Sequence, residues 1–266
     1  MRNQRDEAEF EDGEFHDFWE SLETALAQVG ELLAANDPTP RQFRDLNPDD
    51  TRFGVRFLIG LTSFFDTLIV GSAGFSLMLA RQGWYPGGNL PIGTLSEAAT
   101  LLSEGDEEGE RILASHFEAE AGALGRALIT AHPERADAIE QTLEAHQTGN
   151  YWLTVPSFLI LAEAIAKDHG MPSPYSKSKK TGEKSILKAL AARDDFQVAI
   201  AFMAPLLVSV PIDWSPEQRA KYGNPVLNRH LILHGESKDY GTRLNSLRAL
   251  SHLLYVSDVL RGSLSG

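Results

Sequence analysis

The spacing of apolar side chains predicts helices along most of the chain. Near its start, apolar residues recur every three or four positions, which is the repeat of an amphipathic helix. These positions are Phe15, Phe18, Trp19, Leu22, Leu26, Val29, Leu32 and Leu33. The stretch Asn36-Asp37-Pro38 is expected to end this helix. No segment alternates apolar and polar residues as a half-buried strand does, so the pattern predicts an all-α helical bundle.

The other expected elements follow from breaks in the same pattern. Residues 53–81 are interpreted as one or two buried helices, and residues 82–93 as a loop. Further helices are expected at 94–103, 104–131, 134–146, 151–167, 184–192, 196–208, 225–234 and 242–260. Residues 168–183 are expected to form a polar linker, and residues 211–224 a loop with a short turn. We expect Pro156 near the first turn of its helix, where a missing N–H costs little.

Charge divides the chain into two parts. The net charge is −13, but residues 1–150 carry ten arginines, no lysine and 27 acidic residues, whereas residues 151–266 carry 14 basic and ten acidic ones. We therefore expect an acidic all-α region at 1–147 and a second helical domain at 148–266. An acidic region repels nucleic acid, and a mildly basic one does not. A solvated acidic surface that aids solubility is the alternative interpretation.

Several classes of protein are excluded or disfavoured. The chain has no cysteine, which excludes disulfides, thiolate chemistry and cysteine-ligated metals. Its first 15 residues are acidic and lack the apolar core of a signal peptide. The uncharged stretch 67–80 has 14 residues, too few to span a bilayer. We therefore expect a cytoplasmic protein without a membrane partner. Phosphate-binding glycine loops, GxSxG and HExxH are absent.

Candidate chemistry concentrates in residues 224–250. There Asn228, Arg229, His230 and His234 surround the apolar Leu231-Ile232-Leu233, and Gly235 offers a helix stop. Buried polar groups need partners, so this combination requires an explanation. On an ideal helix, five steps of ~100° place the arginine and the second histidine ~140° apart. Either the helix unwinds near the glycine, or another element or subunit completes the site.

Two chemical interpretations and one structural interpretation fit these residues. In the first, His234 is a general acid–base and Arg229 stabilises a phosphate oxyanion, which suffices for metal-free attack of an RNA 2′-hydroxyl on its own phosphate. In the second, His230 and His234 bind zinc with a third ligand from Glu236, Asp239 or Glu163. In the third, the arginine and histidines fasten the last two helices together.

Arg229 to His234 also matches R-x4-H, the motif of the HEPN superfamily (higher eukaryote and prokaryote nucleotide-binding domains). His230 occupies the place after the arginine, where the family typically has a polar residue. The strings HGESKDYGTRLNSLRAL and YWLTVPSFLILAEAI also resemble a bacterial branch of HEPN-like proteins. That branch has an Ile-Glu-Gly-like tripeptide in a central helix. Here Glu163 keeps the glutamate and Ala164 replaces the glycine, and the resemblance covers residues 148–262.

The resemblance implies a C-terminal bundle of four or five helices that forms a homodimer, with additional N-terminal helices outside it. It implies a metal-independent endoribonuclease that needs no cofactor and acts on an RNA substrate, with Arg229 and His234 as catalytic residues and His230 as their polar helper. Some members are inactive binding or scaffolding modules, which is the alternative function for this chain. A stress-response or phage-defence role with a regulatory protein partner would suit either function.

Other residues are assigned supporting or substrate-binding roles. Glu163 lies in an apolar helix, where an unpaired carboxylate is costly, so we expect it to pair with Arg229 or a histidine; a surface position is the alternative. Tyr240 is expected to pack between helices or to hydrogen-bond the motif. The substrate-binding candidates are Asn228, Lys179, Lys180 and Arg243. Lys177, Lys184 and Arg248 are further candidates for contact with phosphate, or ordinary surface charges.

Overall fold

The computed structural model describes residues 74–88, 90–177, 184–191, 203–223 and 225–261. The chain divides into two units, Met1–Ser72 and Ala73–Gly266. The first unit lies outside the described residues, as does the predicted helix at 15–33. The described residues all belong to the second unit.

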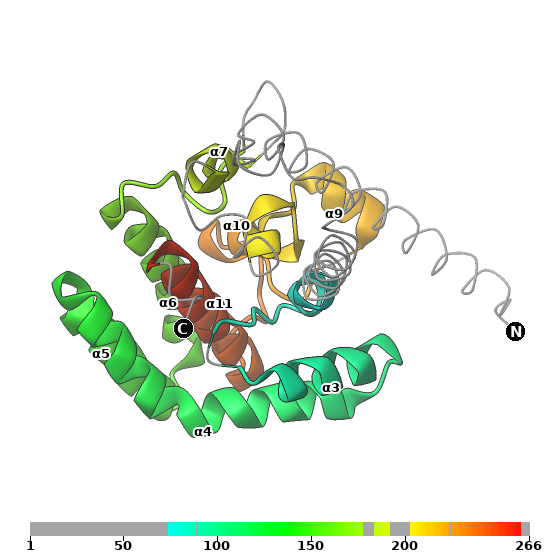
Figure 1. Ribbon diagram of the computed structural model, residues 1–266, viewed down its shortest axis with the longest axis horizontal. Coiled ribbons are helices and arrows are strands. Elements are labelled where there is room, and N and C mark those ends of the chain that lie inside the picture. The colour runs from blue at the N-terminus through cyan, green and yellow to red at the C-terminus, as the bar shows by residue number, and fades with distance from the viewer. Residues whose placement is uncertain (1–73, 89, 178–183, 192–202, 224, 262–266) are drawn as a thin grey trace, which may run out of the picture. The chain divides into compact units, whose positions relative to one another are not determined.

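Helices and turns make up the described residues, which contain no strand, so the predicted all-α class is confirmed. An isolated antiparallel bridge joins Lys177 and Lys184. Residues 74–81 and 203–207 are helical. The named helices, most of them labelled in Figure 1, are α3 (Ile92–Ser103), α4 (Glu107–Ala131), η2 (Pro133–Arg135), α5 (Ala136–Gln147), α6 (Tyr151–Asp168), α7 (Ser185–Ala191), η3 (Pro211–Asp213), α9 (Pro216–Tyr222), α10 (Arg229–Leu233) and α11 (Arg243–Arg261).

The helices are arranged around α11. It packs lengthwise on α6 and also contacts α4, while α3 and α5 pack against α4 from either end (Figure 1). The short α10 contacts both α6 and η3, which places the R-x4-H residues beside α6. The expected domain boundary after residue 147 falls between α5 and α6, and these two helices pack against each other. The described residues on the two sides of that position therefore belong to one packed unit.

Local sequence explains where several helices begin and end. Asp106 caps α4, since its Oδ1 accepts from the Glu108 N–H at 2.8 Å, and three glutamates occupy the first turn, where negative charge is favourable. His132-Pro133 ends α4 as predicted. The helix α9 was not predicted. Ser215 and Gln218 form a capping box around Pro216 at its start, so the segment predicted as a loop is partly helical.

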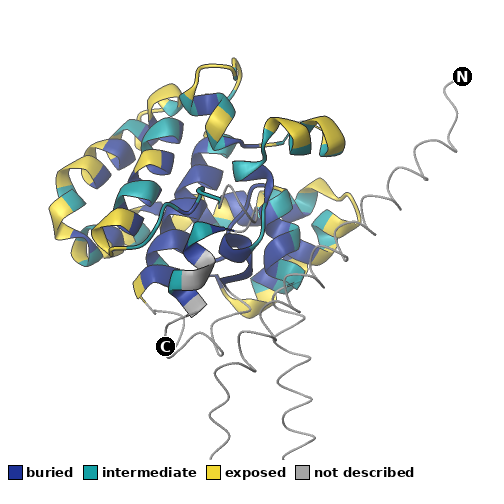
Figure 2. Ribbon diagram, turned by 90° about the horizontal axis from the view of Figure 1, so that it is seen from above, coloured by how far each residue is buried: buried dark blue, intermediate teal, exposed yellow. Residues whose placement is uncertain are grey.

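The last helix is the core of the unit. The sequence predicts one buried stripe there, from Leu244 to Val259, but α11 is buried on nearly all sides (Figure 2). Two of its buried serines form hydrogen bonds with histidines outside α11. Ser246 bonds His146 of α5 at 2.8 Å, and Ser257 bonds His132 at 2.7 Å. Because buried hydrogen bonds have strict geometry, these contacts fix the rotation and the position of α11 along its axis.

His252, in the middle of α11, gives the fold an expected sensitivity to acid. Its ring stacks on Tyr85 with centroids 4.5 Å apart and meets the Tyr175 ring edge-on. Burial lowers the pKa of His252 to about 3. An unfolded histidine titrates near 6.5, so the unfolded state binds more protons below that pH. Stability is therefore retained above pH 6.5 and lost as the pH falls, by about 2 kcal/mol at pH 5.

Urea unfolding at pH 7.5 and pH 5 measures this loss in the wild type. Burial also lowers the pKa of His132 and of His146, which adds loss of the same sign. The His252→Phe variant isolates one contribution, because phenylalanine keeps the ring packing and cannot be protonated. We expect its stability to differ less between the two pH values than that of the wild type. An equal difference in both proteins would show that His252 is not protonated on unfolding.

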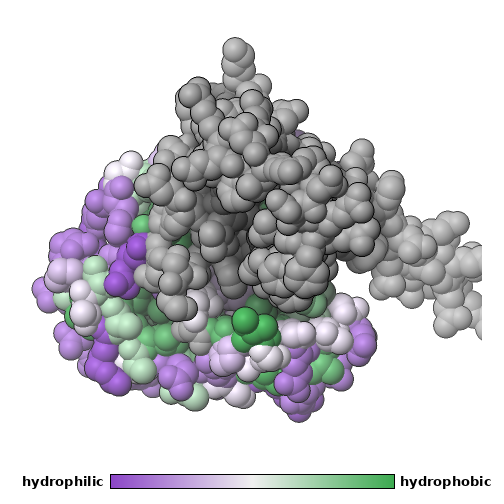
Figure 3. Space-filling view, in the orientation of Figure 1, coloured by the Kyte–Doolittle hydropathy of each residue, from purple (hydrophilic) through white to green (hydrophobic). Residues whose placement is uncertain are grey.

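The outer surface carries most of the hydrophilic side chains. In Figure 3 they line the edge along which α4 and α5 run. The central α6 departs from this pattern, because Trp152, Leu153 and Ile160 are 51%, 64% and 54% exposed. Among the described residues, no helix combines the length and apolarity that crossing a membrane requires. The apolar face of α6 is therefore a local feature, and it lies on the helix that carries Glu163.

Candidate functional site

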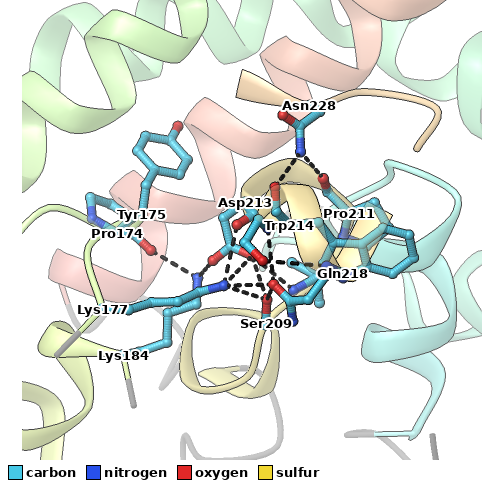
Figure 4. Close-up of polar contacts among 12 residues, drawn as sticks. Pro174, Tyr175, Lys177, Lys184, Ser209, Pro211, Asp213, Trp214, Gln218 and Asn228 are labelled. Carbon is cyan, nitrogen blue, oxygen red and sulfur yellow. Dashed lines mark hydrogen bonds and ion pairs between the residues drawn. The ribbon is translucent and has the colours of Figure 1, made fainter. Parts of the chain in front are cut away.

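The motif residues lie on α10, which is five residues long and held at its start by Asn228. The Asn228 Oδ1 accepts from the Leu231 N–H at 3.1 Å and so caps the helix. Its Nδ2 donates to the carbonyls of Pro211 at 2.7 Å and Trp214 at 3.2 Å (Figure 4). The side chain is buried and its amide groups are engaged. The structure thus places this substrate-binding candidate as the anchor between α10 and η3.

Two exposed histidines lie on α10: His230 in its first turn and His234 at its C-cap. The helix ends at Leu233, and Gly235 follows the C-cap with φ 73°, a conformation that favours glycine. The expected helix 225–234 is therefore shorter, and it ends where the sequence predicts. The rings of His230 and His234 lie 4.3 Å apart between centroids. The Nε2 of His230 is 3.7 Å from a carboxylate oxygen of Glu236.

Arg229, at the first position of α10, points toward α6. Its guanidinium pairs with the carboxylate of Glu163, and that carboxylate also lies 3.2 Å from the Lys167 ammonium. The predicted partnership between the helix glutamate and the motif arginine is thereby confirmed. The guanidinium also lies over the Tyr175 ring, 4.6 Å from its centroid, at a distance typical of a cation–π contact. These contacts hold the arginine in one place with about a quarter of its side chain exposed.

The electrostatics of this pair follow from its surroundings. Burial opposes ionisation of Glu163, but the charges of Arg229 and Lys167 outweigh burial and hold the pKa of its carboxyl below the usual value. The carboxylate is therefore ionised at neutral pH and neutralises much of the arginine charge. The Arg229 Nε is buried and has no hydrogen-bond partner among the described residues, so one donor of the guanidinium is unused.

Arg229 and His234 do not form a joint site within one described chain. No hydrogen bond between them occurs among the described residues, and the two side chains have different neighbours. Arg229 contacts Glu163 and Tyr175 on the α6 side, whereas the ring of His234 contacts His230 on an exposed side of α10. This separation agrees with the ~140° expected from an ideal helix. A site that uses both groups needs an additional element.

The lysines near the linker lie in a different environment from the one expected of RNA-binding residues. Lys184 is buried and pairs with Asp213 (Figure 4). Lys177 donates to Ser209 at 2.7 Å, to Gln218 at 3.0 Å and to the Asp213 carbonyl at 3.2 Å. Their ammonium groups are thus occupied within the fold, and Lys184 is too buried to contact phosphate, whereas a contact by the partly exposed Lys177 stays a prediction. Lys179 and Lys180 lie outside the described residues.

The two arginine candidates of α11 also have protein partners. Arg243 is about half exposed and donates to Glu118 at 3.0 Å, so it stays accessible to a ligand. Arg248 is buried, pairs with Glu110 and lies over the Trp84 ring. It therefore stabilises the packing of α11 against α4, and the alternative of a phosphate contact is wrong for this residue.

Tyr240 compensates for a proline. Pro156 is the sixth residue of α6, beyond the first turn where it was expected, so the Trp152 carbonyl lacks its i+4 helix donor. The Tyr240 hydroxyl donates to that carbonyl at 3.3 Å, and its ring packs edge-on against the Trp152 ring. Gly241 lies so close to the same indole that a Cβ would meet it at 2.4 Å. The expected packing role of Tyr240 is confirmed.

We expect Tyr240→Phe to lower the free energy of unfolding by about 1 kcal/mol or less, because one partly exposed hydrogen bond is lost. Urea unfolding measures this. In a Pro156→Ala background, the new alanine supplies the missing N–H, so the effect of Tyr240→Phe should shrink. Equal effects in the two backgrounds would show that the hydroxyl does not compensate for the proline.

The remaining candidates concern metals and unpredicted residues. Among the described residues, no group of three or more His, Asp or Glu side chains is placed to hold a metal ion. Glu163, one of the possible zinc ligands, is paired with Arg229 instead. The sequence did not indicate Tyr175 or Asp213 as parts of this region. Tyr175 lies in a linker without periodicity, so only the path of the chain brings it under the arginine.

Comparisons of the chain with protein-family models, with curated proteins and with solved structures gave no match.

Proposed function

We propose that this protein is a metal-independent endoribonuclease whose site is built on α10. The observation that carries the proposal is the exposed His230–His234 pair on α10 and its C-cap, together with a guanidinium that is fixed on the other side of the same helix. Histidine exchanges protons near neutral pH, and a guanidinium binds phosphate oxygens. The R-x4-H resemblance points to the same chemistry.

The roles of the residues follow from what the reaction requires. The RNA 2′-oxygen attacks the adjacent phosphorus, its proton goes to an imidazole, and the 5′-oxygen leaves with a proton supplied by an acid. The products are a 2′,3′-cyclic phosphate and a 5′-hydroxyl. His234 takes the acid–base role, and His230 helps to orient it. Arg229 supports the charge on the phosphate oxygens. No protein nucleophile is needed, because the RNA supplies it.

The proposal includes a second copy of the chain. Within one chain the arginine and His234 are separated, so a second copy would have to bring an arginine to a histidine. The face of α6 next to Glu163 suits such a contact, because Leu153 and Ile160 are 64% and 54% exposed there. Apolar side chains exposed together on a soluble protein commonly mark an interface.

One observation favours a second candidate, a non-catalytic helical module. The motif arginine is paired with Glu163 and packed on Tyr175, so it ties α10 to α6. In that case the histidines would be surface residues, and the apolar face of α6 would bind a partner protein. The two functions differ in whether the purified protein cleaves RNA.

The test is incubation of the full-length protein with RNA in EDTA, followed by analysis of the new ends. Cleavage that leaves 2′,3′-cyclic phosphates, and that is lost in Arg229→Ala and in His234→Ala, supports the ribonuclease. Light scattering on the same samples measures the mass, which should be that of a dimer. Failure of the wild type to cleave structured or unstructured RNA, at protein in excess over RNA, favours the binding module.

A further inference from the structure

A hollow on the other side of α10 has no role in the chemistry described so far. It has a volume of about 470 Å³, within the ~300–1,000 Å³ usual for small-molecule sites. Its walls come from residues 225–228, from Leu231 and Ile232 of α10, from residues 236–240 and from Asn245 at the start of α11. Leu231 lies ~200° around α10 from Arg229, so the hollow and the arginine occupy different sides of the helix.

The hollow adjoins the histidine pair. Glu236 lines it, and the same carboxylate lies 3.7 Å from the Nε2 of His230. A ligand in the hollow would therefore lie one side chain away from the imidazoles. This position suits a group that is covalently attached to whatever the histidines bind. If the histidines act on RNA, that group is a nucleobase next to the scissile phosphate.

The lining restricts which base would fit. The NH₂ groups of Asn228 and Asn245 donate to backbone carbonyls, and the Tyr240 hydroxyl donates to the Trp152 carbonyl. The Asn228 amide and the phenol are therefore not free to donate to a ligand, and Asn245 keeps one N–H for this purpose. The carboxylates of Glu236 and Asp239 remain, and both residues are exposed. Such a site accepts hydrogen bonds from its ligand and favours a base whose edge carries N–H donors.

Guanine meets this requirement best. Its Watson–Crick edge presents N1–H and N2–H₂ side by side, a fork that a carboxylate binds with two parallel hydrogen bonds. Uracil offers one N–H between two carbonyls, which a carboxylate repels. Adenine and cytosine place a ring nitrogen acceptor beside their amino group. The apolar Val226 and Leu231 supply a surface for the face of the base, and Lys238 supplies a cation for a flanking phosphate.

We propose that the hollow behind α10 is a nucleotide-binding subsite selective for guanine, with Asp239 as the residue that reads the base and Lys238 as the phosphate contact. The proposal rests on the proposed ribonuclease function for its biological role. Its binding chemistry is separable from cleavage, because Asp239 and Lys238 are outside the proposed acid–base machinery. Asp239 Oδ1 accepts from Ser237 at 3.1 Å, which orients the carboxylate; this oxygen keeps a second lone pair, so both carboxylate oxygens can accept from a base.

Calorimetric titration of the full chain with guanosine monophosphate and, separately, with uridine monophosphate tests the proposal. We expect the wild type to bind the guanine nucleotide about tenfold or more tightly than the uracil one. Asp239→Asn should abolish this preference, because an amide replaces one acceptor by a donor. Lys238→Ala should weaken both nucleotides alike. Glu140→Gln, which removes an exposed carboxylate of α5, is the matched control and should change neither.

The outcomes separate this proposal from the ribonuclease proposal. Equal or undetectable binding of the two nucleotides by the wild type, or a preference that survives Asp239→Asn, overturns the guanine subsite. Selective binding by a protein that does not cleave RNA upholds the subsite and removes the ribonuclease. RNA cleavage without base preference, together with unselective nucleotide binding, supports the ribonuclease and overturns the guanine subsite.

Discussion

Asp213→Ala should lower the free energy of unfolding by about 3–5 kcal/mol, the usual cost of breaking a buried ion pair by removing one partner. The side chains of Asp213 and Lys184 are 1% and 3% exposed, so water cannot take over the lost contact. The same carboxylate also accepts from the Ser209 hydroxyl at 3.0 Å and from the Val210 N–H at 3.1 Å. Chemical denaturation monitored by circular dichroism measures the effect.

Asp168→Ala is the matched control. Asp168 pairs with Arg135 through two hydrogen bonds of 2.7 Å, but both side chains are partly exposed, at 27% and 37%. Pairs of this kind contribute about 0–1 kcal/mol. The variant that combines Asp213→Ala with Lys184→Met removes both buried charges and should be less destabilised than Asp213→Ala alone. Similar losses for Asp213→Ala and Asp168→Ala would show that the Lys184 ammonium reaches solvent.

His234→Ala should slow the proposed RNA cleavage by about 10²–10⁴-fold, the usual contribution of a positioned general acid–base. The side chain is exposed at the end of α10, so its removal should leave the unfolding free energy within about 0.5 kcal/mol of the wild type. Single-turnover cleavage rates with excess protein measure the effect on chemistry. A matched thermal denaturation curve shows that the fold is kept.

His169→Ala provides the comparison for that variant. His169 is also exposed, it follows the end of α6, and its ring contacts His132 rather than the α10 histidines. Its removal should leave the cleavage rate unchanged. If His234→Ala cleaves as fast as His169→Ala, then His234 has no part in proton transfer, and the acid–base assignment must be abandoned even if the protein cleaves RNA.

Helix positions were predictable here because apolar spacing and capping residues are local signals. The predicted helix at 94–103 corresponds to α3, and the break at His132-Pro133 lies where α4 ends. The relative burial of α6 and α11 was not predictable in the same way. α6 is apolar yet has an exposed face, whereas α11 is almost fully buried although its buried residues include serines, an arginine and a histidine. Burial of such residues depends on partners contributed by other helices.

The candidate site shows the same limit. The pairing of Glu163 with Arg229 was predictable, since an acidic residue in an apolar helix needs a compensating charge. The role of Tyr175 was not, because it depends on how a linker without periodicity folds back under α10. The burial of Lys184 was not predictable either. A lysine in a polar, lysine-rich segment suggests solvent exposure, and only the fold places Asp213 against it.

The five-residue length of α10 has a consequence for control of the histidines. A helix this short is not stable by itself in water. It is stabilised by the hydrogen bonds of Asn228 at its start and by the contact of Arg229 with α6. Loss of the hydrogen bonds from Asn228 to the Pro211 and Trp214 carbonyls would disorder α10 and would therefore displace the two imidazoles. The positions of the histidines therefore depend on η3, which they do not themselves contact through any hydrogen bond among the described residues.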